Sequence, residues 1–152
     1  MSDSTLLAAY LATAWTVDAP AGPLTVRFNH VAPDPLLRPS GIVTAHHPAS
    51  GPLSDVEARR AHDLLLLELR HRGLPFRPAY AHPVAVSAAG HGEPGFAVLG
   101  EVRDLLVELG GAFGQHAVVW IDARGRVSLV CAHDGFAGCA AGEAIEAPEA
   151  AS

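Results

Sequence analysis

The sequence predicts an α+β fold with a ferredoxin-like βαββαβ core over residues 41–121. Segments with strand-like and helix-like apolar patterns follow one another in the order strand, helix, strand, strand, helix, strand. The length of 152 residues and an apolar fraction of 49% suit a chain with one hydrophobic core. We therefore expect one domain over residues 1–132, with an added N-terminal helix and one strand flanking each side of the core.

The N-terminal part is expected to contain a helix, a break and a strand. Thr5–Trp15 carries leucine and tryptophan at helical spacing, and Ser4 can cap it. Asp18–Pro23 contains two prolines and a glycine, which break regular structure. Leu24–Phe28 alternates apolar and polar residues, so it predicts a half-buried strand.

The core is expected to begin with a buried strand over Gly41–Ala45 and a helix from Ser54 to about Arg72. Ser54 and Glu57 have the spacing of a capping box, and Gly73 is the expected C-terminal cap. The two form the first strand–helix unit of the predicted core.

This second helix has two apolar faces, because Leu66 and Leu67 lie off the stripe that Leu65 and Leu69 form. A second apolar face requires a second neighbour. Two hypotheses remain: the N-terminal helix covers this face, or it is a homodimer contact.

The second half of the core is expected to contain two strands, a helix and a central strand. Three prolines interrupt Leu74–Val86, which favours an edge strand. A loop over Gly90–Gly95 leads to a strand over Phe96–Leu99. Apolar residues at i, i+3, i+4 and i+7 predict a helix from Glu101 to Phe113, and Val118–Ile121 is apolar throughout, typical of a central strand.

The C-terminal part is expected to hold one more strand and a tail. Asp122–Gly125 predicts a hairpin turn, and Val127–Cys131 predicts the last strand. Residues 133–152 are rich in Gly, Ala and Glu, so we expect a disordered tail.

The predicted topology brings three loops to one end of the sheet: those after Gly41–Ala45, before Phe96, and before Val118. Loops on a rigid scaffold commonly carry binding residues. We therefore predict a ligand-binding site in these loops. Its candidate residues are Thr44, His47, His91, Glu93 and Gln115.

Three motifs in these loops resemble those of an uncharacterised bacterial family, the domain of unknown function family 3293. They are Thr44-Ala45-His46-His47-Pro48 with Ser54-Asp55-Val56-Glu57-Ala58, then His91-Gly92-Glu93-Pro94-Gly95-Phe96, then Phe113-Gly114-Gln115-His116-Ala117. The resemblance spans roughly Tyr10 to Cys131. It supports the fold and implies no particular activity.

This chain departs from the family pattern in all three motifs. His47, Ala58 and His116 stand where the pattern has asparagine, and Gly95 stands where it has serine. These departures imply that a site shared by the family is modified or lost here.

Three functional hypotheses remain open, and the first two place the site at this end of the sheet. The first is a module that binds a small polar or anionic ligand. The second is an enzyme with His91 and Glu93 as acid and base, because a neighbouring carboxylate tunes an imidazole for proton transfer near neutral pH. The third is an interaction protein that works through the second helix or a sheet edge.

Each candidate also has a simpler structural interpretation. Glu93 can cap loop amides, and Gln115 can hydrogen-bond the loops together. A metal is a weaker alternative for His47, His91 and His116, because neutral imidazoles suit zinc, nickel or copper.

A second metal hypothesis combines Cys131 and His133 with Cys139. The simpler interpretation is that Cys131 points into the core.

Composition argues against several classes of function. The net charge is −6, and no arginine cluster is interleaved with aromatic residues, so nucleic acid is not an expected partner. The chain has no phosphate-binding Gly-x-x-x-x-Gly-Lys pattern, no lysine and no Gly-x-Ser-x-Gly, so no cofactor or nucleophile is indicated and enzyme status stays open. No apolar run reaches about 18 residues, and two cysteines without a secretory signal fit a reducing cytoplasm.

Overall fold

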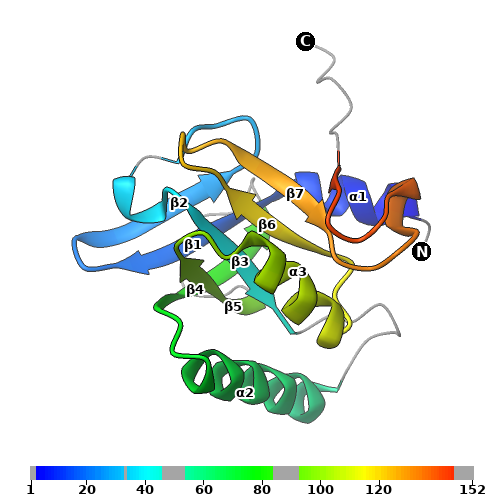
Figure 1. Ribbon diagram of the computed structural model, residues 1–152, viewed down its shortest axis with the longest axis horizontal. Helices are drawn as coiled ribbons and strands as arrows, with labels where there is room; N and C mark the ends of the chain where they lie inside the picture. Colours follow the sequence, from blue (N-terminus) through cyan, green and yellow to red (C-terminus); the bar gives the residue numbers. More distant parts are fainter. Residues whose placement is uncertain (1–2, 33, 46–53, 84–92, 146–152) are drawn as a thin grey trace.

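The computed structural model describes residues 3–32, 34–45, 54–83 and 93–145, which form an eight-stranded antiparallel sheet with helices on both faces (Figure 1). The strand order is β2-β1-β4-β5-β3-β6-β7-β8. The strands are β1 (Thr13–Ala19), β2 (Gly22–Arg27), β3 (Ser40–Thr44), β4 (Phe76–Pro83), β5 (Glu93–Leu99), β6 (Ala117–Ile121), β7 (Val127–Cys131) and β8 (Ala144–Ile145). The helices are α1 (Asp3–Leu11), α2 (Asp55–His71) and α3 (Arg103–Ala112), with 3-10 turns η1 (Pro35–Leu37) and η2 (Phe136–Gly138).

The predicted α+β class is confirmed, and the sheet is larger than predicted. Six strands were expected, and the described residues form eight. The additional strands are β1 and β8, one near each end of the sheet.

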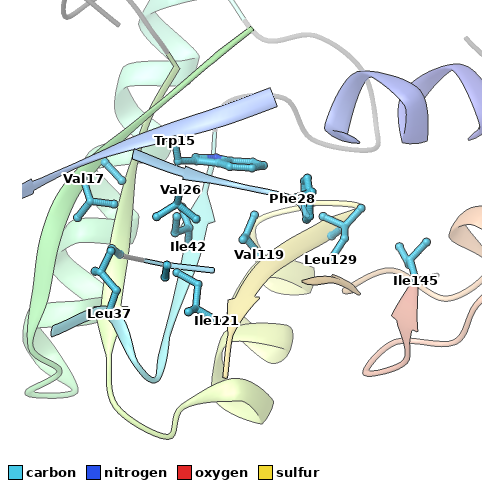
Figure 2. Packing of buried hydrophobic residues seen from close by; sticks show 14 of the residues in the cluster. Trp15, Val17, Val26, Phe28, Leu37, Ile42, Val119, Ile121, Leu129 and Ile145 are labelled. Atoms are coloured by element: carbon cyan, nitrogen blue, oxygen red, sulfur yellow. The ribbon is translucent and has the colours of Figure 1, made fainter. Parts of the chain in front are cut away.

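The sheet curls, so that side chains from strands near its two ends pack together on one face. Val26 of β2 and Leu129 of β7 come from opposite ends of the strand order, yet both belong to one buried apolar cluster. An isolated bridge from Val31 to Arg126 joins the segment after β2 to the β6–β7 hairpin. We call this cluster the inner core, and Figure 2 shows Trp15, Ile42 and other members converging in it.

The other face carries α2 and α3, which bury Leu65, Leu69, Leu106 and Leu109 against β3, β5, β6 and β7. Figure 1 shows α2 and α3 on the same side of the sheet, while α1 lies apart from them, beside β7 and η2. We call this second cluster the helix-side core.

The second helix forms as predicted. The Ser54 hydroxyl accepts a hydrogen bond from the Glu57 amide at 3.2 Å, and the Glu57 carboxylate accepts one from the Ser54 amide at 3.3 Å. Gly73 follows the helix with a φ of +66°, a left-handed conformation that glycine adopts without strain.

The prediction that the N-terminal helix covers the second apolar face of α2 is wrong. Leu6, Leu7 and Tyr10 of α1 pack against the inner core, on the opposite face of the sheet from α2. Leu66 packs at the margin of the helix-side core, whereas Leu67 is 59% exposed. The alternative, a homodimer contact, stays a prediction.

The predicted N-terminal helix ends four residues early, and a strand follows it. Trp15 and Val17 are buried in the inner core and alternate with Thr16 and Asp18, which is the two-residue period of a strand. The expected break is instead a tight hairpin, in which Ala19 pairs with Gly22.

The predicted edge strand, β4, lies inside the sheet between β1 and β5. Its prolines sit where the ladder with β1 ends. That ladder runs from Ala79 to Pro83, so Pro78 lies one residue outside it and Pro83 forms its terminal pair. The missing N–H groups of these two prolines therefore leave the interior of that ladder intact.

Disorder was expected from residue 133, but the structure places η2 and β8 in this segment. β8 pairs with β7, and Phe136 and Ile145 are buried in the inner core. Two large apolar residues thus anchor an otherwise small and polar segment. The part of the tail from 146 to 152 lies outside the described residues.

Candidate functional site

Thr44 and Gln115 meet at the end of the sheet where β3 ends and β6 is about to begin. The Thr44 hydroxyl donates a hydrogen bond of 3.0 Å to Oε1 of Gln115. The backbone N–H of Gln115 donates to the Gly110 carbonyl at 2.8 Å, in the last turn of α3. Two of the three predicted loops therefore meet, and Gln115 has the loop-joining contact that the sequence suggested.

The Gln115 side chain is 3% exposed, and Thr44 occupies its carbonyl oxygen. In the part of the chain that the structure describes, its Nε2 has no hydrogen-bond partner. Buried polar groups in proteins are hydrogen-bonded in the large majority of cases, so an orphan donor of this kind calls for an explanation.

Glu93 lies in a strand rather than in the predicted loop. It is the first residue of β5 and pairs with Ala81 of β4. Two residues further on, Gly95 pairs with Thr44 of β3. Because side chains alternate along a strand, Glu93 and Thr44 project from the same face of the sheet. This is the face of the inner core, since Ile42 and Ala97 of the same two strands belong to it.

Tyr10 of α1 packs against the inner core and contacts the start of β6. Burial raises the pKa of Tyr10 to about 12, the negative charge of Glu93 acts in the same direction, and a hydrogen bond with the Ala117 backbone opposes both. The phenol therefore stays protonated at neutral pH. It supplies a hydroxyl close to the Glu93 carboxylate and the start of β6.

Sequence reasoning missed Tyr10 as a candidate site residue. A weak signal was present, because Tyr10 is the polar-tipped residue in the apolar set of Leu6, Leu7 and Leu11. Its proximity to Glu93 depends on how α1 docks, which local sequence does not encode.

His116 points toward the C-terminal segment. Its ring lies 4.6 Å from that of Phe136 and 6.0 Å from that of His133. Burial lowers the pKa of His116, His133 lowers it further, and Asp3 acts in the opposite direction. Nδ1 of His116 is buried, and no described residue hydrogen-bonds to it.

Cys131 points into the inner core, as the simpler interpretation predicted. Its thiol donates to the His133 carbonyl at 3.0 Å, and burial raises its pKa. In the part of the chain that the structure describes, no three His, Cys, Asp or Glu residues are grouped so that they could hold a metal ion. The hypothesis of a metal held by Cys131, His133 and Cys139 thus finds no support in their arrangement.

Two of the predicted site residues, His47 and His91, lie outside the described residues. The acid–base hypothesis for His91 with Glu93 and the metal hypothesis for His47, His91 and His116 therefore stay predictions. Among the described residues, Thr44 and Gln115 are hydrogen-bonded, Glu93 projects from the same face of the sheet as Thr44, and Tyr10 is close enough to feel the charge of Glu93.

Over the described ranges, no helix combines the length and apolarity needed to cross a bilayer.

Comparison with known proteins identifies a family for this chain. A family model described as "Protein of unknown function (DUF3293)" matches residues 43–118, half of the chain. Thr44, Glu93 and Gln115 lie inside the matched segment, and Tyr10 lies before it. No curated protein and no solved structure matches the chain.

Proposed function

We propose that this protein binds a small polar ligand at the end of the sheet where β3 ends. The chain belongs to the DUF3293 family of proteins of unknown function, so the proposal rests on the site and not on the family. Thr44, Glu93 and Gln115 are the proposed contacts, with Tyr10 as a fourth. The observation that carries the proposal is the buried Gln115 carboxamide, whose Oε1 accepts from Thr44 while Nε2 has no partner among the described residues.

The energetics of the orphan donor favour a ligand. A buried donor without a partner costs about 1–3 kcal/mol relative to one that is hydrogen-bonded. Thr44 already holds the carboxamide in place from one side. A ligand carbonyl or hydroxyl that accepts from Nε2 would recover the hydrogen bond without rearranging Gln115.

The neighbouring groups define the class of ligand. Glu93 is an acceptor when ionised, and Tyr10 keeps its proton at neutral pH. A ligand with a carbonyl or hydroxyl acceptor for Gln115 and a hydroxyl or amino donor for Glu93 fits both. The negative charge of Glu93 disfavours an anionic group in this place, so we narrow the sequence-based hypothesis to a neutral or positively charged polar compound. His47 and His91 remain proposed additional contacts.

We also propose that β3-α2-β4-β5-α3-β6 is a ferredoxin-like core. β3 and β4 are both antiparallel to β5, which lies between them, and β5 and β6 are both antiparallel to β3. Each helix therefore connects two parallel strands across an intervening one, which is the split βαβ arrangement.

The test is a ligand-observed NMR screen with a panel of amino acids, small carboxamides and monosaccharides. Wild type is compared with Gln115→Met, which keeps the side-chain length and removes the donor, and with Tyr10→Phe. Ser128→Ala is the matched control, since its hydroxyl contacts the Trp120 carbonyl elsewhere in the sheet.

We expect at least one polar compound to bind wild type and Ser128→Ala, and to bind Gln115→Met at least about tenfold more weakly, the loss of one good hydrogen bond. Binding that is equally strong in Gln115→Met, or a panel without any Gln115-dependent binder, would overturn the proposal.

A further inference from the structure

A recess lies at the opposite end of β6 from Gln115. It is an open pocket of about 360 Å³, lined by Asn29, His30, Val31, Arg126 and Val127. Ordinary small-molecule pockets have volumes of roughly 300–1,000 Å³, so this one has room for a small compound. It sits between the turn after β2 and the first residues after the β6–β7 turn.

Arginine side chains lie at and beside this pocket. Nη2 of Arg27 lies 3.0 Å from Nε2 of His30, a lining residue. Within the described chain, the guanidinium of Arg126 makes no hydrogen bond or ion pair. Arg38 lies behind the wall, where it donates to the Ala32 carbonyl. Three of the ten arginines thus gather around one short segment of a chain whose net charge is −6.

None of the described residues that line the pocket is acidic. The nearest acidic residue along the chain after Val31 is Asp34, whose carboxylate accepts from the Leu36 amide. On the other wall, Asp122 accepts from the backbone amides of Arg124 and Arg126, at 2.9 Å each. These two carboxylates therefore accept hydrogen bonds from the backbone of their own turns, and neither forms an ion pair with the Arg126 guanidinium in the described chain.

The pocket walls are fixed by backbone contacts. Asn29 has a φ of +64°, in the left-handed region, which turns the chain sharply after β2. His30 then donates from Nδ1 to the Phe28 carbonyl at 3.1 Å, so its Nε2 is free to accept from Arg27. The Ala32 amide donates to the Gly125 carbonyl at 2.8 Å, which ties the two walls together.

We propose that this pocket binds an oxyanion, the phosphate or carboxylate group of a small molecule. Arg126 and Arg27 are the charged contacts, and Asn29 supplies a side-chain amide donor. Guanidinium groups match both anions, because their N–H donors form two parallel hydrogen bonds to paired oxygens. This site is separate from the proposed polar site, so either can fail without the other.

The test is a ¹H–¹⁵N NMR titration of the full chain with inorganic phosphate, with sodium acetate as a second arm. Sodium chloride keeps the ionic strength constant, because salt alone screens exposed charges. We expect the backbone amides of Val31, Gly125 and Val127 to shift and saturate. Saturation with phosphate alone identifies a phosphate site, and saturation with both anions identifies a general oxyanion site.

Arg126→Gln should weaken the binding by about tenfold or more, as expected for the loss of one charge-assisted contact. The backbone bonds of Arg126 do not involve its side chain, so this variant should fold, and Arg27→Gln provides a second, independent test. Arg59→Gln, an exposed site on α2, is the matched control and should bind like wild type. Non-saturating shifts with both anions, or equal affinity of both pocket variants and the control, would overturn the proposal.

Discussion

Replacing Thr44 by valine and Gln115 by methionine together should leave the unliganded protein at least as stable as the wild type. The double variant removes both partners of the 3.0 Å hydrogen bond and, with them, the orphan Nε2 donor. Losing the hydrogen bond costs about 0.5–1.5 kcal/mol, and removing the orphan donor returns about 1–3 kcal/mol. The expected net gain in the free energy of unfolding is therefore roughly 0.5–1.5 kcal/mol.

The single variant Thr44→Val should behave in the opposite way. It leaves the whole Gln115 carboxamide buried without a partner, so we expect a loss of about 1–3 kcal/mol. Thr25→Val on the exposed part of β2 is the control for the change of residue type and should stay within about 0.5 kcal/mol of wild type.

Urea unfolding, followed by tryptophan fluorescence, measures all four proteins. Trp15 and Trp120 are both buried, one in each core, so the signal reports on the whole sheet. A double variant that is more than about 1 kcal/mol less stable than wild type would refute the reasoning. It would mean that Gln115 has a structural role that its contacts do not reveal.

Three further predictions concern the packing and the pH dependence. Gly95→Ala should lose about 1–3 kcal/mol of stability, because the new Cβ would lie 2.6 Å from Cγ2 of Thr44 and 2.7 Å from a backbone carbonyl of β3; a Tm equal to wild type would contradict this. Leu65→Ala should lose about 2–5 kcal/mol of stability, whereas Leu67→Ala should lose less than about 0.5 kcal/mol, since Leu65 is buried and Leu67 exposed. Similar losses for the two variants in urea unfolding would contradict this orientation of α2. Burial holds the pKa of His116 below its value in the unfolded chain, so its contribution is complete above about pH 6.5 and is lost as the pH falls toward the lowered pKa. Thermal unfolding between about pH 7 and 5 should therefore show a smaller loss of stability for His116→Gln than for wild type, and identical pH profiles would count against it.

The elements that the sequence predicted well are those whose local signals agree. α2 has a capping box, an apolar stripe and a terminal glycine, and all three lead to the same boundaries. β3 and β6 are buried on both faces; the continuous apolar run of β6 and the adjacent Ile42 and Val43 of β3 are typical of central strands.

The N-terminal helix was extended too far because two periods compete in the same residues. Leu7, Leu11 and Trp15 recur every four residues, as in a helix, while Trp15 and Val17 recur every two, as in a strand. Packing decides between them, since Trp15 meets the edge of the Phe28 ring at 5.5 Å across the inner core. This contact is long-range, and local pattern does not contain it.

The sequence predicted only part of the candidate site, because the remaining contacts are long-range as well. Thr44 and Gln115 meet because strand order alone brings the end of β3 beside the start of β6. Tyr10 joins them only because α1 docks on the inner core, where the Tyr10 ring meets that of Phe136 at 5.9 Å and the Asp3 carboxylate accepts from the Ala137 amide. Phe136 belongs to the segment expected to be disordered. The expectation of disorder therefore left out both β8 and the contact that holds Tyr10 in place.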